Sequence, residues 1–416
     1  MDLVVALCGW AFLAPLTFLW PRDPRRVVFF GRDGGKFIDN CKHFFAAVHD
    51  FTDGGVHAVY IAKDESLRSR LADLGANAVR HQSLAAWWNW LRAGVIVVDS
   101  IDWCRQGRFP AARGARLIQL WHGVPLKHVQ LALLQPRLQR LPRPFAWLLS
   151  LQRSVTGRFA MSDVFLSTSP FVTEHAFSAS FRYRKVSHAG YPRNDVLLRP
   201  GNPLAELGVD SVAQHRVRMH RNSGRGLVGL YAPTFRNSFA DPFASGAMGL
   251  EILSSTAVAF DMLLLVKLHP WMLGKSRKRD LPGLHFVEPD SDAYPLMRDV
   301  DFLITDYSSI FFDFLLLNRP VVFFPYDLDQ YLASERSMYF DYASMTPGPK
   351  ATTIEELARI LEAVHTSEDT WEAERRRVRS LVFSHVDGNS GERLAIQLFP
   401  CLSNSSSGRD RDDDEE

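Results

Sequence analysis

Residues 299–331, DVDFLITDYSSIFFDFLLLNRPVVFFPYDLDQY, decide the fold class of this chain. Phe302–Thr305 is a short apolar run, long enough for a buried strand, and residues 306–309 form a polar turn. Residues 310–317 are apolar and stop before Pro320, which indicates a short buried helix. Residues 321–324 are β-branched and aromatic and predict the next strand. The stretch is therefore a β-α-β unit, the unit from which parallel sheets are built.

Two serines follow the first strand of this unit directly. Ligands of open α/β sheets bind at the carboxyl ends of the strands, and the free N–H groups at a helix start attract anions. Because two hydroxyls add further donors, we expect Ser308 and Ser309 to bind a phosphate. The alternative is that Ser308 only caps the helix.

Five motifs in order carry a family resemblance. The segment TDYSSIFFDFLLLNRPVVFFPYD resembles the signature of the CDP-glycerol glycerophosphotransferase family, the teichoic-acid polymerases and primases. Four other segments resemble motifs of that family: LIQLWHGVPLKH (117–128), GYPRND (190–195), LYAPTFRN (230–237) and LLVKLHP (264–270). The resemblance implies a GT-B-like fold, with two Rossmann-like parallel-sheet domains facing across a cleft. It also implies the transfer of glycerol phosphate from CDP-glycerol to an acceptor hydroxyl, with release of CMP, in teichoic-acid or capsule synthesis.

The order of strands and helices along the chain agrees with an α/β fold. Strand-like runs start near residues 26, 56, 95, 117 and 164, and a second series starts near 227, 262, 284, 302 and 321, with helical pieces between them. We expect an apolar segment (1–25), an acceptor domain (26–207), a passage (208–225), a donor-nucleotide domain (226–402) and a disordered acidic tail (403–416).

Composition excludes some classes of protein. The 48 basic and 46 acidic residues nearly balance, so the charge gives no strong case for a nucleic-acid partner. The four cysteines, Cys8, Cys41, Cys104 and Cys401, form no C-x-x-C pair, which indicates neither a zinc site nor a disulfide framework. A reducing, cytosolic setting fits this pattern.

Two segments point to a membrane. Residues 3–20 carry no charge and just reach the length of a spanning helix, and basic residues follow that would hold the body in the cytoplasm. We expect this segment to attach the protein to the cytoplasmic face of the cell membrane, either spanning or monotopic; the alternative is a buried first helix. Residues 136–159 are basic and apolar together, as in a helix on an anionic membrane or in an ordinary surface helix.

Two histidines are the candidate catalytic residues. His122 follows an apolar strand, in a turn fixed by Gly123 and Pro125, where a neutral imidazole can take a proton from an acceptor hydroxyl. His269 also follows a strand and could stabilise the charge on the leaving CMP. The alternative for each is a core histidine bonded to the backbone.

Other polar residues of the motifs have a binding and a structural interpretation. Arg193 could clamp a phosphate or pair with Asp195, and Lys267 could bind phosphate or face the other side of the sheet. Thr234 offers a hydroxyl, and Asp313 could bind a ribose or glycerol hydroxyl or a neighbouring amide. The resemblance implies donor contacts at His122, Gly123, Val124, Pro125, Leu126, Arg193, Pro233, Thr234, Lys267, Leu268, His269, Ser308, Ser309 and Asp313. Val124 stands where the family commonly has Thr, which leaves the transferred polyol open.

No resident metal or cofactor is predicted. Asp299-Val300-Asp301 has the form D-x-D, but it precedes its strand and so lies at the wrong end of the sheet for a metal–nucleotide site. The expected partners are a CDP-polyol donor, a lipid-linked or polymeric hydroxyl acceptor and the membrane surface; the oligomeric state and the number of units added stay open. The alternatives are a GT-B glycosyltransferase that uses a nucleotide sugar and a catalytically inactive membrane-anchored scaffold.

Overall fold

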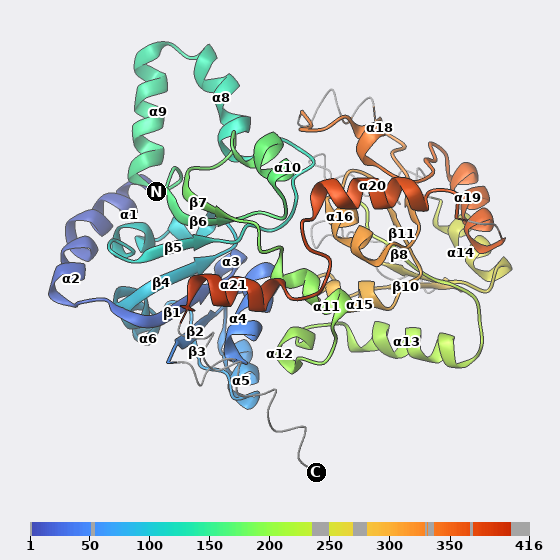
Figure 1. The fold of residues 1–416 in the computed structure, drawn as a ribbon, viewed down its shortest axis with the longest axis horizontal. Helices are drawn as coiled ribbons and strands as arrows, with labels where there is room; N and C mark the ends of the chain where they lie inside the picture. Colours follow the sequence, from blue (N-terminus) through green and yellow to red (C-terminus); the bar gives the residue numbers. More distant parts are fainter. Residues whose placement is uncertain are drawn as a thin grey trace. The chain divides into compact units, whose positions relative to one another are not determined.

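Two compact α/β units make up the chain. The computed structural model describes residues 2–50, 55–234, 249–268, 281–328, 331, 337–366 and 369–400. The first unit comprises Met1–His122, Val129–Glu206 and the described residues from Ser384 on, and the second comprises Gly123–His128 and Leu207–Phe383. Each unit contains one parallel sheet (Figure 1), so the expected two-sheet α/β class is confirmed.

The first unit is built on a seven-stranded sheet in the order β3-β2-β1-β4-β5-β6-β7. Its strands, all paired in parallel, are β1 (Asp23–Phe30), β2 (His57–Ala62), β3 (Ala78–Arg80), β4 (Ala93–Val98), β5 (Arg116–Gln119), β6 (Ser162–Leu166) and β7 (Tyr183–Ser187). The sequence predicted the inner strands but not β3 and β7, which lie at the two edges. An edge strand has one neighbour only, and β7 exposes Arg184 and Lys185, so its sequence lacks a continuous apolar run.

Helices cover both faces of this sheet, because successive side chains of each strand point to opposite faces and both faces are apolar. Phe29 of β1 packs on Phe44 and Phe45, with ring centroids 5.6 and 5.2 Å apart, whereas Phe30 packs on Trp90 at 5.8 Å. The helices of this unit are α1 (Asp2–Cys8), η1 (Gly9–Leu13), α2 (Ala14–Leu19), α3 (Arg32–Gly35), α4 (Asp39–His49), α5 (Glu65–Asp73), α6 (Leu84–Arg92), η3 (Asp102–Cys104), α7 (Arg108–Ala111), α8 (Gln130–Arg140), α9 (Arg143–Val155), α10 (Pro170–Val172), η4 (Thr173–Phe177), η5 (Pro192–Asn194), α11 (Asp195–Leu198), α12 (Pro203–Glu206) and α21 (Ser390–Leu398).

The last helix within the described residues, α21, belongs to the first unit, although its sequence position suggested the second. The carboxylate of Asp195 accepts hydrogen bonds from the N–H groups of Ser390 (2.9 Å) and Gly391 (2.7 Å) at the start of α21. Leu394 and Leu398 of α21 are buried. Gly190 has a φ of +90°, and a Cβ there would lie 2.5 Å from the Ser390 hydroxyl, so this position needs glycine.

The second unit has a five-stranded parallel sheet in the order β10-β9-β8-β11-β12. Its strands are β8 (Val228–Tyr231), β9 (Leu263–Val266), β10 (Leu284–Phe286), β11 (Phe302–Thr305) and β12 (Val321–Phe323). Its helices are α13 (Ser211–Asn222), α14 (Leu250–Ala259), α15 (Tyr294–Arg298), α16 (Ile310–Phe314), η8 (Leu315–Leu317), α18 (Tyr342–Met345), α19 (Ile354–Thr366) and α20 (Glu372–Val382). The β-α-β unit predicted from residues 299–331 is therefore β11–α16–η8–β12, with a short helix as expected.

The expected passage at residues 208–225 is mostly helical. Helix α13 starts where Asp210 accepts hydrogen bonds from Val212 and Ala213 at 3.0 Å, a normal helix cap. The helix buries Ala213, Val217 and His220, which are spaced at four and three residues on one face. The arginines of α13 face solvent, and because they dominate its composition the sequence did not predict this helix.

Candidate active site

The candidate site in the first unit lies where the strand order reverses. Strands β1 and β4 are neighbours in the sheet but not in the sequence, and such switch points form ligand-binding crevices at the carboxyl ends of the strands. Arg32 follows β1, Asp99 follows β4 and His122 follows β5, so three charged or titratable side chains meet at one edge.

His122 is held in one tautomer by the backbone. Its Nδ1 lies 2.9 Å from the carbonyl oxygen of Asp99, which can only accept, so Nδ1 carries the proton and Nε2 is the basic nitrogen. Burial and, after it, the positive charge of Arg32 lower the pKa of His122 to about 4. The ring is therefore neutral at pH 7, with Nε2 ready to accept a proton. The core-histidine alternative describes the Nδ1 contact but leaves Nε2 unused.

The backbone before His122 is strained. Trp121 has a φ of +55°, which is uncommon for an aromatic residue, and its carbonyl accepts a hydrogen bond from the Asn40 side chain at 2.9 Å. The Arg193 guanidinium donates to the carbonyl of His122 at 2.9 Å. Such strain persists only where several contacts fix the backbone, and it is common at functional sites.

Arg193 pairs with Asp39 and not with Asp195. Its Nη1 lies 2.5 Å from Asp39, and Arg32 lies 3.5 Å from the same carboxylate. Burial alone would raise the pKa of Asp39, but the two guanidinium groups outweigh it and lower that pKa to about 2. Asp99 has the opposite shift: burial and the neighbouring Asp39 charge raise its pKa to about 8. The two aspartates thus differ in charge at neutral pH.

Three of these residues were not assigned a role from the sequence. They are Arg32, Asp39 and Asp99. The signal that could have found Arg32 and Asp99 is their position just after predicted strands, at the ends of β1 and β4. Asp39 begins helix α4 and has no such signal.

The candidate site in the second unit also lies at a switch point, between β8 and β11. Asp306 follows β11, and its carboxylate accepts hydrogen bonds from the N–H groups of Thr234 (2.8 Å) and Tyr307 (2.5 Å). Asp306 therefore connects the end of β8 to the end of β11. From the sequence it was predicted only as part of a polar turn, without a role. The hydrogen bond to Asp306 ties Thr234 to the turn that also contains Ser308 and Ser309.

The two serines do not behave as simple caps. Helix α16 begins at Ile310, and its capping residue, Ser309, makes no side-chain cap hydrogen bond. Both serines are half-buried at the end of β11. Their hydroxyls are therefore available in the place where the sequence predicted a phosphate.

Lys267 and Asp313 have protein partners. The Lys267 ammonium donates to the carbonyls of Glu288, Pro289 and Ser291 at 2.6, 2.8 and 2.9 Å, so it holds the turn after β10. Burial lowers the pKa of Lys267 to about 8. Asp313 is fully buried and accepts a hydrogen bond from the Tyr294 hydroxyl at 2.7 Å. Direct donor contacts of these two residues stay predictions.

The remaining predicted residues fall into two groups. Gly123, Val124, Pro125 and Leu126 are buried and belong to the second unit, where Leu126 accepts from the N–H of Tyr339 at 3.0 Å. Leu268 is also buried there. His269 lies outside the described residues. Within the described ranges, no group of three or more His, Cys, Asp or Glu side chains could hold a metal ion.

The fold and the two strand-end sites define a two-domain α/β transferase, and comparisons with known proteins agree. The CDP-Glycerol:Poly(glycerophosphate) glycerophosphotransferase family matches residues 13–399. The structure of the wall teichoic acid polymerase TagF superposes with a TM-score of 0.72 at 22% identity, over 97% of this chain and 95% of that one. This chain belongs to the CDP-glycerol glycerophosphotransferase family, as the five motifs predicted.

The curated relatives are teichoic acid polymerases, transferases and primases. The teichoic acid poly(glycerol phosphate) polymerase of Bacillus spizizenii is 26% identical over 92% of this chain and 93% of its own length. Two other such polymerases, from Bacillus subtilis and Staphylococcus epidermidis, are matched over only 32% and 45% of their lengths. A teichoic acid ribitol-phosphate primase of Bacillus spizizenii is 34% identical, over 40% of this chain and 42% of its own.

Proposed function

We propose that this chain transfers a polyol phosphate, glycerol phosphate or a relative, from a CDP-polyol to an acceptor hydroxyl in teichoic-acid-like polymer synthesis. The observation that carries this proposal is the fixed tautomer of His122, which leaves Nε2 unprotonated in a ring whose pKa is lowered by burial and by the nearby charges of Arg32 and Arg193. A neutral base with cationic neighbours suits the removal of a proton from a hydroxyl that attacks a negatively charged phosphorus.

The reaction is a substitution at phosphorus. The acceptor oxygen bonds to the distal phosphorus of the CDP-polyol, the bond to the bridging oxygen breaks, and CMP leaves as a phosphodiester forms. Nε2 of His122 takes the hydroxyl proton. Ser308 and Ser309 bind a donor phosphate, and His269, by the family motif, stabilises the leaving charge. The work of the protein is positioning and charge stabilisation, as in phosphoryl transfer generally.

A donor screen tests the reaction. CDP-glycerol, CDP-ribitol and nucleotide sugars are supplied separately with a lipid-linked or polymeric acceptor, and the released nucleotide is identified. We expect CMP from a CDP-polyol. Release of a nucleoside diphosphate from a sugar donor would instead support a glycosyltransferase, and donor binding without turnover would support an inactive scaffold. Because a ribitol-phosphate primase shares 34% identity over part of the chain, both polyols belong in the screen.

We also propose that the first unit lies on the membrane through its N-terminal helix. The helix Asp2–Leu19 is long and apolar enough to cross a bilayer, and 17% of it is buried. One face contacts the unit through Ala6 and Ala14, while Phe12 and Leu19 on the other face are 71% and 70% exposed. The Trp10 indole donates to the carbonyl of Val155 at 3.0 Å. A helix fastened along its length favours the monotopic over the spanning arrangement.

The side of the membrane follows from the donor. A CDP-polyol is a cytosolic nucleotide, and the use of this donor supports the cytoplasmic face. The basic residues after the helix contribute less to this assignment than the sequence suggested. The guanidinium of Arg22 donates to the carbonyls of Trp90 and Ala111, both at 2.7 Å, and Arg26 donates to Asn89. These two arginines therefore hold the first unit together.

A further inference from the structure

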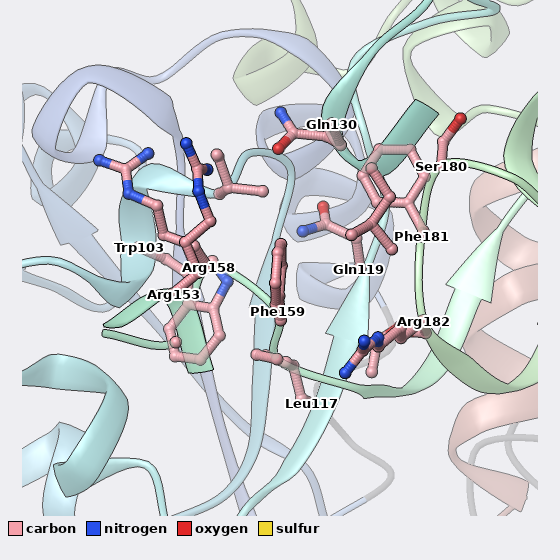
Figure 2. Close-up of a pocket in the computed structure, with 15 residues that line it drawn as sticks. Trp103, Leu117, Gln119, Gln130, Arg153, Arg158, Phe159, Ser180, Phe181 and Arg182 are labelled. Atoms are coloured by element: carbon pink, nitrogen blue, oxygen red, sulfur yellow. The ribbon is translucent and has the colours of Figure 1, made fainter. Parts of the chain in front are cut away.

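A pocket in the first unit lies apart from the residues assigned to transfer. It is a small hollow of about 40 Å³, and neither His122 nor Arg193 lines it. Figure 2 shows the guanidinium groups of Arg153 and Arg158 on one side of the Phe159 ring and Arg182 on the other. Three cations, one from α9, one from the turn after it and one from the residue before β7, thus surround one hollow.

Few acidic groups neutralise these arginines. The guanidinium group of Arg153 makes no hydrogen bond or ion pair with any described residue, and its Nε is buried. Arg182 lies over the Phe159 ring, 5.1 Å from its centroid, and has no carboxylate partner in the described parts of the chain. Only Arg158 has one, Asp2 at 3.6 Å. Burial and the charges of Arg158 and Arg137 lower the pKa of Arg153, as close like charges require.

The sequence around the pocket repels cations and attracts anions. From residue 103 to residue 162 there is no aspartate or glutamate, while nine arginines and one lysine occur. An anion in the pocket would therefore meet no opposing carboxylate from this part of the chain. Guanidinium groups bind phosphate oxygens in a forked, two-bond geometry, which makes phosphate the natural ligand class.

The pocket lies next to the N-terminal helix that is proposed above to contact the membrane, because Arg158, which lines the pocket, pairs with Asp2 of that helix. Helix α9 buries none of its side chains, and Phe145, Trp147 and Leu148 are 61%, 65% and 57% exposed. Its last turn carries Arg153, and the Asp2–Arg158 pair joins the turn after α9 to the start of the N-terminal helix. Apolar side chains and arginines at one junction match the apolar and phosphate layers of a bilayer.

We propose that this arginine pocket, formed by Arg153, Arg158 and Arg182, binds the phosphate headgroup of an anionic membrane lipid. The proposal rests on the membrane contact of the proposed function and adds a specific site to it. Gln119 and Phe181, which also line the pocket, both contact Trp121: Gln119 accepts from its N–H at 3.0 Å, and Phe181 packs on its ring at 4.5 Å. A headgroup bound in the pocket would therefore contact residues that support Trp121, the residue next to His122.

Charge-conserving variants separate a headgroup site from diffuse attraction. Lysine keeps the charge but loses the forked geometry, so Arg153→Lys/Arg182→Lys should weaken binding to vesicles of equimolar phosphatidylcholine and phosphatidylglycerol by about tenfold or more. Arg140→Lys/Arg143→Lys, on the exposed basic surface outside the pocket, is the matched control and should bind like the wild type. Cosedimentation gives the affinities, and thermal unfolding checks that all variants fold.

The outcomes distinguish a headgroup site from general attraction to the bilayer and from a site for a soluble anion. Equal affinities of the pocket variant and the wild type would overturn the headgroup site and leave general attraction to the bilayer. A wild-type protein that ignores both these vesicles and pure phosphatidylcholine would overturn the membrane contact itself, whatever the donor screen shows. If inorganic phosphate without vesicles raises the melting temperature of the wild type but not of the pocket variant, the site takes a soluble anion, and the lipid assignment is wrong.

Discussion

His122 is the residue on which the proposed chemistry depends most. The Asp99 carbonyl fixes its tautomer, so a replacement should keep the Nδ1 donor and remove only Nε2. Asparagine does this, and we expect His122→Asn to stay folded while turnover falls about 10²–10⁴-fold, the range for loss of a general base. Turnover with a CDP-polyol and circular dichroism on the same preparation are the measurements. A variant with near-normal turnover would remove His122 from the mechanism.

The lowered pKa of His122 predicts a pH-dependent stability. In the unfolded chain the ring takes a proton near pH 6.5, but in the folded chain only near pH 4. Between these values the unfolded state binds more protons, so stability is lost as the pH falls. From pH 7 to pH 5 the wild type should lose about 2 kcal/mol more than His122→Asn, measured by denaturant unfolding. Equal losses would show that the ring titrates normally in the fold.

Ser308 and Ser309 can be tested for binding and capping together. Each hydrogen bond to a charged group contributes about 1.5–3 kcal/mol, part of which water would restore, so the double alanine variant should lose roughly tenfold to a few hundredfold in donor affinity. Thr353→Ala is the control, because its hydroxyl does cap α19, accepting from Glu356 N–H at 3.2 Å. That control should lose stability and keep its affinity. If the serine variant instead has a lowered melting temperature and an unchanged donor affinity, the two serines only cap the helix and do not bind the donor.

At the scale of elements, the N-terminal helix has two faces with different roles. Phe12 and Leu19 are on the exposed face, so Phe12→Ser/Leu19→Ser should lower vesicle binding by at least about tenfold without lowering the melting temperature. Val212→Ser/Met219→Ser on α13, which are 56% and 55% exposed, is the matched control and should leave vesicle binding unchanged. Loss of stability in the helix variant instead would identify it as a part of the soluble core.

At the scale of the whole molecule, helix α21 near the end of the chain belongs to the first unit, which also contains the beginning of the chain. The two carboxylate oxygens of Asp195 accept hydrogen bonds from the two N–H groups at the start of α21. Asp195→Asn replaces one of these oxygens by an NH2 group, so one backbone N–H loses its acceptor. We expect the free energy of unfolding of the first unit to fall by about 1–3 kcal/mol, measured with denaturant. Glu174→Gln, an exposed substitution in the same unit, should have no such effect. An unchanged stability would mean that α21 is held by its apolar face alone.

The sequence by itself determined the fold class and the family. Inner strands of parallel sheets are apolar on both faces, so short runs such as Val228–Tyr231 and Phe302–Thr305 are visible in the sequence. The strand-end positions of His122, Thr234 and Ser308 also follow from local pattern, because a ligand edge is the end of a strand. The edge strands of the first sheet, β3 and β7, and the arginine-rich helix α13 escaped, since their exposed residues mask the periodicity.

Only the tertiary structure decided how polar groups pair. Arg193 and Asp39 are 154 residues apart, and Asp195 and Ser390 are 195 apart, so no local pattern could join them. Lys267 is directed by a turn more than twenty residues away, which no single strand could predict. Hydrogen bonds and ion pairs depend on distances of a few ångströms that are set by packing. The protonation of His122 and the arginine pocket are therefore properties of the fold and not of any one segment.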